Sequence, residues 1–293
     1  MARRLYVDGP YGQMHVRITG GPGGARPPLV CFHMSPMSGR IYERFLDRMA
    51  DERLAVAIDT PGFGMSDAPP SPPSIADYSR SMTAAIDALE IAGPVDLMGY
   101  HTGSMIAADL AADHPSLVRR LILVSAPIFT SGEQAEMRRL YAPLKPSLDG
   151  SHLMKRWTGY VRHNLGRGLD LDDVADMFPD GLLGRNIAWW GHNAAFGFAA
   201  DMRLPEVAQP ILLLNPGDDL QRESRRAPAV MRNGHIVELP GWGHGFLDGF
   251  TGDAASLARS FLEAPDAHPF GSLAIPRSAA HPTDKENPCD TRP

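Results

Sequence analysis

Short apolar runs alternate with helical stretches along most of the chain, and this alternation limits the possible fold more than any other feature of the sequence. The runs are rich in aliphatic residues and cover residues 28–32, 54–58, 94–98, 121–125 and 210–215. Continuous apolar strands are typical of the centre of a parallel sheet, where helices cover both faces. The alternation therefore predicts an α/β fold with a mostly parallel sheet and right-handed crossovers.

The segment 97–104 joins one of these runs to a helix through a turn between Gly99 and Gly103. Its centre is His101. The pattern is that of G-x-S-x-G, in which a serine lies on a sharp strand-to-helix turn and the helix N-terminus behind it favours developing negative charge. Histidine stands here in place of the serine. The pattern thus predicts the position of an active site more firmly than it predicts the reaction.

The charge and the cysteines limit the class of partner and the compartment. The net charge is -6, so the basic surplus of a nucleic-acid-binding protein is absent. No stretch approaches the roughly 20 apolar residues of a membrane span, and residues 1–8 lack the apolar run of a signal peptide. Cys31 and Cys289 lie in an apolar run and a polar segment, respectively, so a disulfide is not expected. We therefore expect a cytoplasmic protein with no nucleic-acid or membrane partner.

The pattern changes between residues 128 and 205, where apolar residues recur at helical spacing without a strand-like run. We predict three or four helices there, lying as a cap over the strand ends. Residues 1–127 and 206–264 are then the two parts of one α/β core, which opens with a β-hairpin. Residues 265–293 are rich in Pro, Ala and polar residues without periodicity, which predicts a disordered tail.

Four further loops follow the ends of predicted strands, where open α/β sheets place their sites. They are His33-Met34-Ser35-Pro36, Asp59-Thr60-Pro61-Gly62-Phe63-Gly64-Met65-Ser66, Asp218-Asp219 and Gly243-His244-Gly245. Together with the turn at His101, they resemble in order and spacing the loops of the α/β-hydrolase superfamily. The resemblance covers about residues 5–263. It implies a mostly parallel eight-stranded sheet flanked by helices, with a helical cap inserted after the sixth strand.

The resemblance also implies roles for residues in these loops. His244 would be the catalytic base, and Asp219 the carboxylate that orients it, with Asp218 as the competing acid. The backbone N–H groups of Thr102 and of Ser35 or Met34 would form the oxyanion hole. Met34 replaces the glycine that the superfamily has in this loop, and His101 replaces the nucleophile.

Several polar and aromatic residues are candidates for the lining of the substrate pocket. They are His33, Tyr100, Trp189, Trp190, His192, Phe196 and Trp242. For His33 we favour hydrogen bonds to the backbone of its own loop over a contact with substrate. For the aromatic residues of the cap we favour a place in the core that joins the cap to the sheet, with the lining of an apolar pocket as the alternative.

A histidine at the turn allows three kinds of chemistry. The imidazole of His101 could attack an acyl carbon. His101 and His244 could instead act as an acid and base pair that activates water or removes a substrate proton. With Asp219, the same two histidines could bind a metal as a two-histidine, one-carboxylate site. The superfamily is metal-free as a rule, so the resemblance implies neither a metal nor a cofactor.

We expect an enzyme that hydrolyses a small or medium apolar substrate with a carbonyl or ester group, using His101, His244 and Asp219. One alternative is a lyase, decarboxylase or cofactor-free oxygenase that uses the histidine pair as acid and base. The other is a binding protein on a hydrolase scaffold, although such a protein would not need an acid and histidine relay. The sequence leaves the oligomeric state open, with a homodimer as one option.

Overall fold

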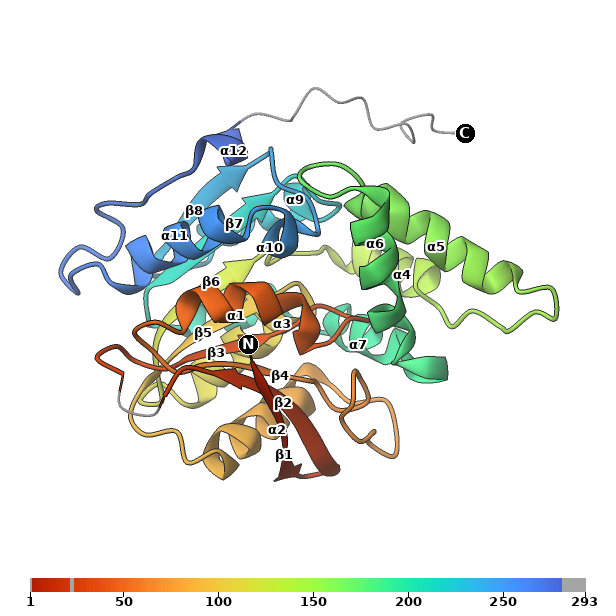
Figure 1. Cartoon of the computed structure of the whole chain (residues 1–293), viewed down its shortest axis with the longest axis horizontal. Helices are drawn as coiled ribbons and strands as arrows, with labels where there is room; N and C mark the ends of the chain where they lie inside the picture. The colour runs from red at the N-terminus through yellow and green to blue at the C-terminus, as the bar shows by residue number, and fades with distance from the viewer. Residues whose placement is uncertain (1, 22–23, 281–293) are drawn as a thin grey trace.

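The computed structural model describes residues 2–21 and 24–280, and within these the strands form one eight-stranded sheet in the order β1-β2-β4-β3-β5-β6-β7-β8 (Figure 1). The strands β1 and β2 form the expected hairpin, β2 pairs antiparallel with β4, and all later pairs are parallel. The strands are β1 (Arg3–Gly9), β2 (Gly12–Thr19), β3 (Leu29–Phe32), β4 (Ala55–Ile58), β5 (Val95–Tyr100), β6 (Val118–Val124), β7 (Ile211–Pro216) and β8 (Gly234–Leu239). The predicted mostly parallel α/β sheet is confirmed.

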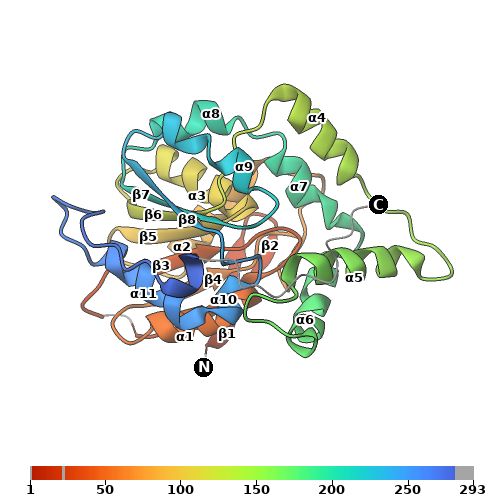
Figure 2. The same ribbon diagram turned by 90° about the horizontal axis from the view of Figure 1, so that it is seen from above.

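Helices cover both faces of the sheet, and each face has its own apolar core (Figures 1 and 2). The helices α2 (Ile75–Ala88) and α3 (Thr102–Asp113) pack against each other on one face. The helices α1 (Glu43–Met49), α10 (Phe246–Gly249) and α11 (Thr251–Leu262) lie on the other. The start of α2 follows from its sequence, because Ser74 and Asp77 form a capping box that satisfies two free backbone N–H groups.

A helical segment lies between β6 and β7, beyond the carboxyl ends of the parallel strands (Figures 1 and 2). In this segment, which is described throughout, there are five short α-helices rather than the expected three or four: α4 (Ser131–Leu140), α5 (Ser151–Asn164), α6 (Leu171–Met177), α7 (Trp189–Ala195) and α8 (Ala200–Arg203). The 3-10 helices η2 (Phe178–Leu182), η3 (Arg185–Ile187) and η4 (Leu204–Glu206) connect them. Buried Asp180 accepts hydrogen bonds from the backbone N–H and the hydroxyl of Ser38, which tie this segment to the core.

The helical stretches that follow β7 and β8 are each interrupted. After β7, α9 (Gln221–Ser224) is separate from the 3-10 helix η5 (Ala227–Ala229), since Pro228 has no N–H to continue an α-helix. After β8, α10 and α11 are separated at Phe250, whose φ of -130° and ψ of 37° are not helical. The 3-10 helix η1 (Gly39–Tyr42) precedes α1.

A few apolar residues of the segment 265–280 contact the core, although a disordered tail is predicted there. Phe270 stacks on Phe261 with ring centroids 5.6 Å apart, and Ala279 in α12 (Arg277–Ala280) is fully buried. The sequence gives no periodic signal because isolated apolar residues, rather than a continuous face, make these contacts. The rest of the predicted tail, including Cys289, lies outside the described residues.

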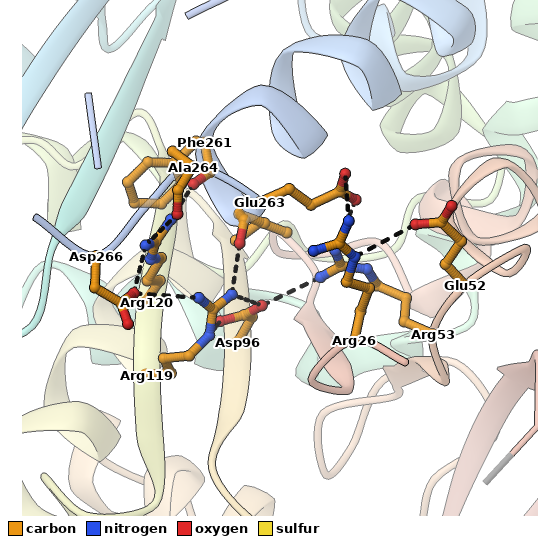
Figure 3. A network of polar contacts seen from close by, with 11 residues as sticks. Arg26, Glu52, Arg53, Asp96, Arg119, Arg120, Phe261, Glu263, Ala264 and Asp266 are labelled. Carbon is orange, nitrogen blue, oxygen red and sulfur yellow. Dashed lines mark hydrogen bonds and ion pairs between the residues drawn. The ribbon is translucent and has the colours of Figure 1, made fainter. Parts of the chain in front are cut away.

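A network of buried ion pairs lies at the amino ends of β5 and β6, away from the cap (Figure 3). Asp96 is fully buried and accepts hydrogen bonds from Arg53 at 3.1 Å and from Arg119 at 2.7 Å. Arg53 also bonds Glu263, and Arg120 bonds Asp266, so the network joins the sheet to the end of α11. In the described residues, no helix is long and apolar enough to span a membrane.

Candidate active site

The site begins at His101, between the end of β5 and the start of α3. Its backbone has φ 49° and ψ -111°, a conformation that residues with a side chain rarely adopt. The glycine at 103 is required here, because a Cβ at that position would collide with the backbone carbonyl of Phe32 on the neighbouring strand β3. The close approach of α3 to β3 thus holds the turn, and the turn places the imidazole at the carboxyl end of the sheet.

Each of the two histidines has its own carboxylate. The imidazole Nε2 of His101 lies 2.9 Å from Oδ2 of Asp218, and Nε2 of His244 lies 3.0 Å from Oδ1 of Asp219. The two rings are nearly perpendicular, with centroids 5.2 Å apart, and no direct hydrogen bond joins them in the described structure. The site therefore consists of two His–Asp dyads that face each other rather than one linear relay. From the sequence, Asp218 and Asp219 are alternatives for the single role of the carboxylate that orients a histidine. In the structure each of them pairs with a histidine of its own.

The charges of the dyads shift the pKa values of their members. Burial alone would raise the pKa of Asp218, but the charge and hydrogen bond of His101 outweigh it and lower that pKa. The pKa of Asp219 is also lowered against the effect of burial, by the hydrogen bond and charge of His244. Burial disfavours the imidazolium of His244, yet its bond to Asp219 raises its pKa above the ordinary value. Both carboxylates are therefore ionised at neutral pH, and His244 readily holds a proton.

Ser125 supports the first dyad and was not predicted. It directly follows β6, has φ 53°, and donates a hydrogen bond from Oγ to Oδ2 of Asp218 at 2.6 Å. The backbone N–H of Leu220 donates to Oδ1 of the same carboxylate at 2.9 Å. With His101, these contacts account for both oxygens of Asp218. A serine after a strand carries no distinctive sequence signal, so only the neighbouring position of β6 and β7 reveals this contact.

In the loop expected to supply the oxyanion hole, some residues hold the loop in place and others face the site. Nδ1–H of His33 donates to the carbonyl of Met34 at 2.9 Å, and Nε2 of His33 accepts from the N–H of Thr60 at 2.9 Å. Both nitrogens of His33 are thus used within neighbouring loops, which is the role we favour from the sequence. Ser35 lines the cavity described below. Thr102 also lines it and opens α3, so its N–H is one of those without an intrahelical acceptor.

A cavity of about 30 Å³ lies between His101 and the helical segment. Of the pocket residues proposed from the sequence, His192 and Phe196 line it, whereas His33, Tyr100, Trp189, Trp190 and Trp242 do not. Ser35, Thr102, His101 and Asp219 also line the cavity and were predicted as site residues. The other lining residues were not predicted: Met105, Pro127, Phe129, Met137, Tyr141, Ala195 and Leu220.

The proposed pocket residues that do not line the cavity have other contacts. Tyr100 donates from its hydroxyl to the carbonyl of His244 at 2.9 Å, which fixes the histidine loop. Trp242 is fully buried and stacks on Phe246 with centroids 4.8 Å apart. Trp189 and Trp190 lie half-buried and contact each other edge to face. An aromatic residue in the sequence does not reveal which side of a short helix meets the site.

Two cap residues close the cavity over the dyads. Tyr141 follows α4, stacks on His192 with ring centroids 4.4 Å apart, and donates a hydrogen bond to Oδ2 of Asp219 at 3.4 Å. Burial and the nearby imidazole of His101 lower the pKa of His192 to about 4, so the His192 imidazole is neutral at neutral pH. The cavity thus has a polar floor that includes one member of each dyad, His101 and Asp219, and a mostly apolar roof.

Comparisons with known proteins agree with this architecture. The family model described as "alpha/beta hydrolase fold" matches residues 27–158. A pimeloyl-[acyl-carrier protein] methyl ester esterase of Neisseria meningitidis is 26% identical over 267 residues, which are 86% of this chain and 82% of that protein. A fluoroacetate dehalogenase of Burkholderia sp. is 26% identical over 276 residues, which are 82% of this chain and 88% of that protein.

Among solved structures, a hydrolase from Pseudomonas aeruginosa superimposes with a TM-score of 0.75 at 18% identity, covering 89% of this chain and 99% of that one. This agreement extends over the sheet and its helices, and the sequence matches include both the loop of Asp59 and the turn at His101. The chain therefore has the α/β-hydrolase fold, and its residues 27–158 match the model of that family.

Proposed function

We propose that this protein hydrolyses a small ester or a related carbonyl substrate by acid and base catalysis between its two His–Asp dyads. The observation that carries the proposal is the separate pairing of His101 with Asp218 and of His244 with Asp219. In a serine hydrolase, one histidine takes a proton from the nucleophile. Here each imidazole has a carboxylate of its own, so each can hold or release a proton without the other.

The pKa values suggest how the two roles divide. His244, whose pKa is raised by Asp219 despite burial, is the better proton donor and serves as general acid. His101 then serves as general base. It takes a proton from a water molecule, and the resulting hydroxide forms a bond to the carbonyl carbon. The tetrahedral oxyanion lies near the N–H groups of Thr102 and Ser35, and the leaving oxygen takes the proton from His244 as its bond to carbon breaks.

The cavity supports a small substrate and a cap that opens. Its volume of about 30 Å³ has room for about two water molecules, so substrate enters only if the roof moves. A methyl ester esterase is among the relatives named above, which supports an ester as the substrate.

The test is turnover of a panel of short-chain p-nitrophenyl, phenyl and methyl esters and small lactones by the wild type. We expect His101→Asn and His244→Asn each to lower kcat/KM by about 10²- to 10⁴-fold, the usual contribution of a general acid or base. His268→Asn is the matched control, because His268 is an exposed histidine far along the chain in the C-terminal segment. Full activity of His101→Asn would overturn the proposal.

Two further outcomes would assign the site to the other chemistries that a histidine at the turn permits. A burst of one equivalent of p-nitrophenolate per enzyme, lost in His101→Asn, would mean that His101 attacks the acyl carbon directly. Turnover of a β-keto acid with release of CO₂, and none of any ester, would favour the lyase alternative with the same acid and base pair.

A further inference from the structure

Three polar side chains of the site lie close enough to bind one ion. A ring nitrogen of His101, a ring nitrogen of His244 and a carboxylate oxygen of Asp218 all lie within 4.8 Å of one another. Two ligands at about 2.1 Å from a tetrahedral zinc ion are about 3.4 Å apart. The 2.9 Å between Nε2 of His101 and Oδ2 of Asp218 is about half an ångström shorter than this spacing, so a cation would move these two atoms apart by about that much.

The charge of the site also favours a cation. Asp218 and Asp219 are consecutive, and each lies within about 3 Å of a histidine of the site, so two carboxylates lie side by side there. The start of α3 carries a partial positive charge that opposes a cation, but two full carboxylate charges outweigh half a charge.

We propose that a divalent cation of the zinc class binds between His101, Asp218 and His244 in this protein. Two imidazoles and one carboxylate form a donor set that suits borderline cations such as Zn²⁺ and Co²⁺ better than Mg²⁺ or Ca²⁺, which prefer oxygen. The three side chains come from the turn after β5, the loop after β7 and the loop after β8, and each is more than half buried. The sheet therefore holds the donors in place before any ion arrives.

A second set, His163, Asp219 and His244, shares one histidine with the first. His163 is exposed on α5, a helix that buries only Asn164, and its ring centroid is 4.8 Å from that of His244. The residues of the set that contains His101 follow strands of the sheet. His163 instead lies on α5, in the cap segment that must move for substrate to enter. We therefore assign the cation to His101 and not to His163.

Binding of a cation has a consequence for catalysis that rests on the proposed function. Bonds to the cation occupy the imidazole lone pairs that the acid and base pair needs, so the loaded enzyme cannot move protons through these atoms. We expect turnover to fall in proportion to occupancy and to return after chelation.

The experiment uses the full chain, stripped with EDTA and checked for residual metal by mass spectrometry. Zn²⁺ and Co²⁺ are titrated by isothermal calorimetry, and the visible absorption of bound Co²⁺ reports nitrogen and oxygen ligation independently of activity. We expect one equivalent of cation per chain. His101→Asn and Asp218→Asn should each weaken binding at least about 100-fold, more than the loss of an outer contact. Asparagine tolerates the positive φ at 101, and circular dichroism verifies the fold of both variants.

The matched controls are His163→Asn and His268→Asn, which should bind Co²⁺ as the wild type does. No binding by the wild type overturns the cation site and leaves the proposed hydrolysis intact. Loss of binding in His163→Asn with full binding in His101→Asn overturns the assignment of ligands. Binding by the predicted ligands without any loss of turnover supports the cation site and overturns the acid and base roles of the two histidines.

Discussion

Replacing Asp218 by asparagine tests whether the first dyad takes part in the reaction. The side chain of Asp218 is fully buried, and its Oδ2 lies 2.9 Å from Nε2 of His101. When His101 takes a proton from water, the imidazolium is stabilised by this carboxylate. Opposite charges about 4 Å apart interact by about 4 kcal/mol at the effective dielectric constant of about 20 that suits protein sites. Loss of the charge should therefore lower kcat about 10³-fold, at about 1.36 kcal/mol for each factor of ten.

The assay compares kcat for the best ester of the panel between Asp218→Asn, Asp219→Asn and the double variant. If the two dyads act separately, the double variant should lose clearly more activity than either single variant until the uncatalysed rate is reached, although adjacent residues need not give strictly additive losses. Residues that act as one relay behave differently, since removing either costs about as much as removing both. Asp172→Asn, an exposed carboxylate on α6, is the control.

The reasoning is refuted if Asp218→Asn keeps kcat within about threefold of the wild type while Asp219→Asn is inactive. The site would then hold a single relay through His244, and the contact between His101 and Asp218 would be structural only.

Three other perturbations test separate parts of the structure. Burial disfavours the charged form of His244, but Asp219 raises its pKa in the folded state, so the stabilising effect is complete below the unfolded pKa and is lost as pH rises through the folded value. The Tm difference between wild type and His244→Asn should therefore shrink as pH rises above the ordinary histidine pKa of about 6.5. Asp96→Ala should lower the free energy of unfolding by about 3–5 kcal/mol in urea, because it leaves buried Arg53 without one of its two carboxylate partners. Gly191→Ala would place a Cβ against the serine hydroxyl of the 33–36 loop and push α7 away from the site, so KM should change more than the Tm, as measured by steady-state kinetics and calorimetry.

The sequence predicts the sheet and the loops better than it predicts the contacts within the site. The order of strands and the place of the turn follow from apolar runs and glycines, since backbone geometry leaves few alternatives at positions such as Gly103. The partners of Asp218 and Asp219 do not follow, because adjacent residues in a loop point in different directions and only the fold decides which histidine each meets. Tyr141 was missed for a related reason: α4 before it buries no residue, so its pattern does not reveal a side that faces the site.

The roof of the cavity explains how the two dyads can be both accessible and protected. The cap meets the floor through Tyr141, whose hydroxyl bonds Asp219 at 3.4 Å, and through Gly191, which lies directly against Ser35. The first contact is a long hydrogen bond and the second a packing contact without a side chain, so both are weak compared with the buried bonds that hold Asp218. Opening the roof at these two contacts therefore breaks little, while Asp180 stays bonded to Ser38 and the floor keeps its geometry. A substrate that bonds Asp219 or His244 in place of Tyr141 would compensate for the opening, which makes the tyrosine hydroxyl the group that an entering substrate must replace.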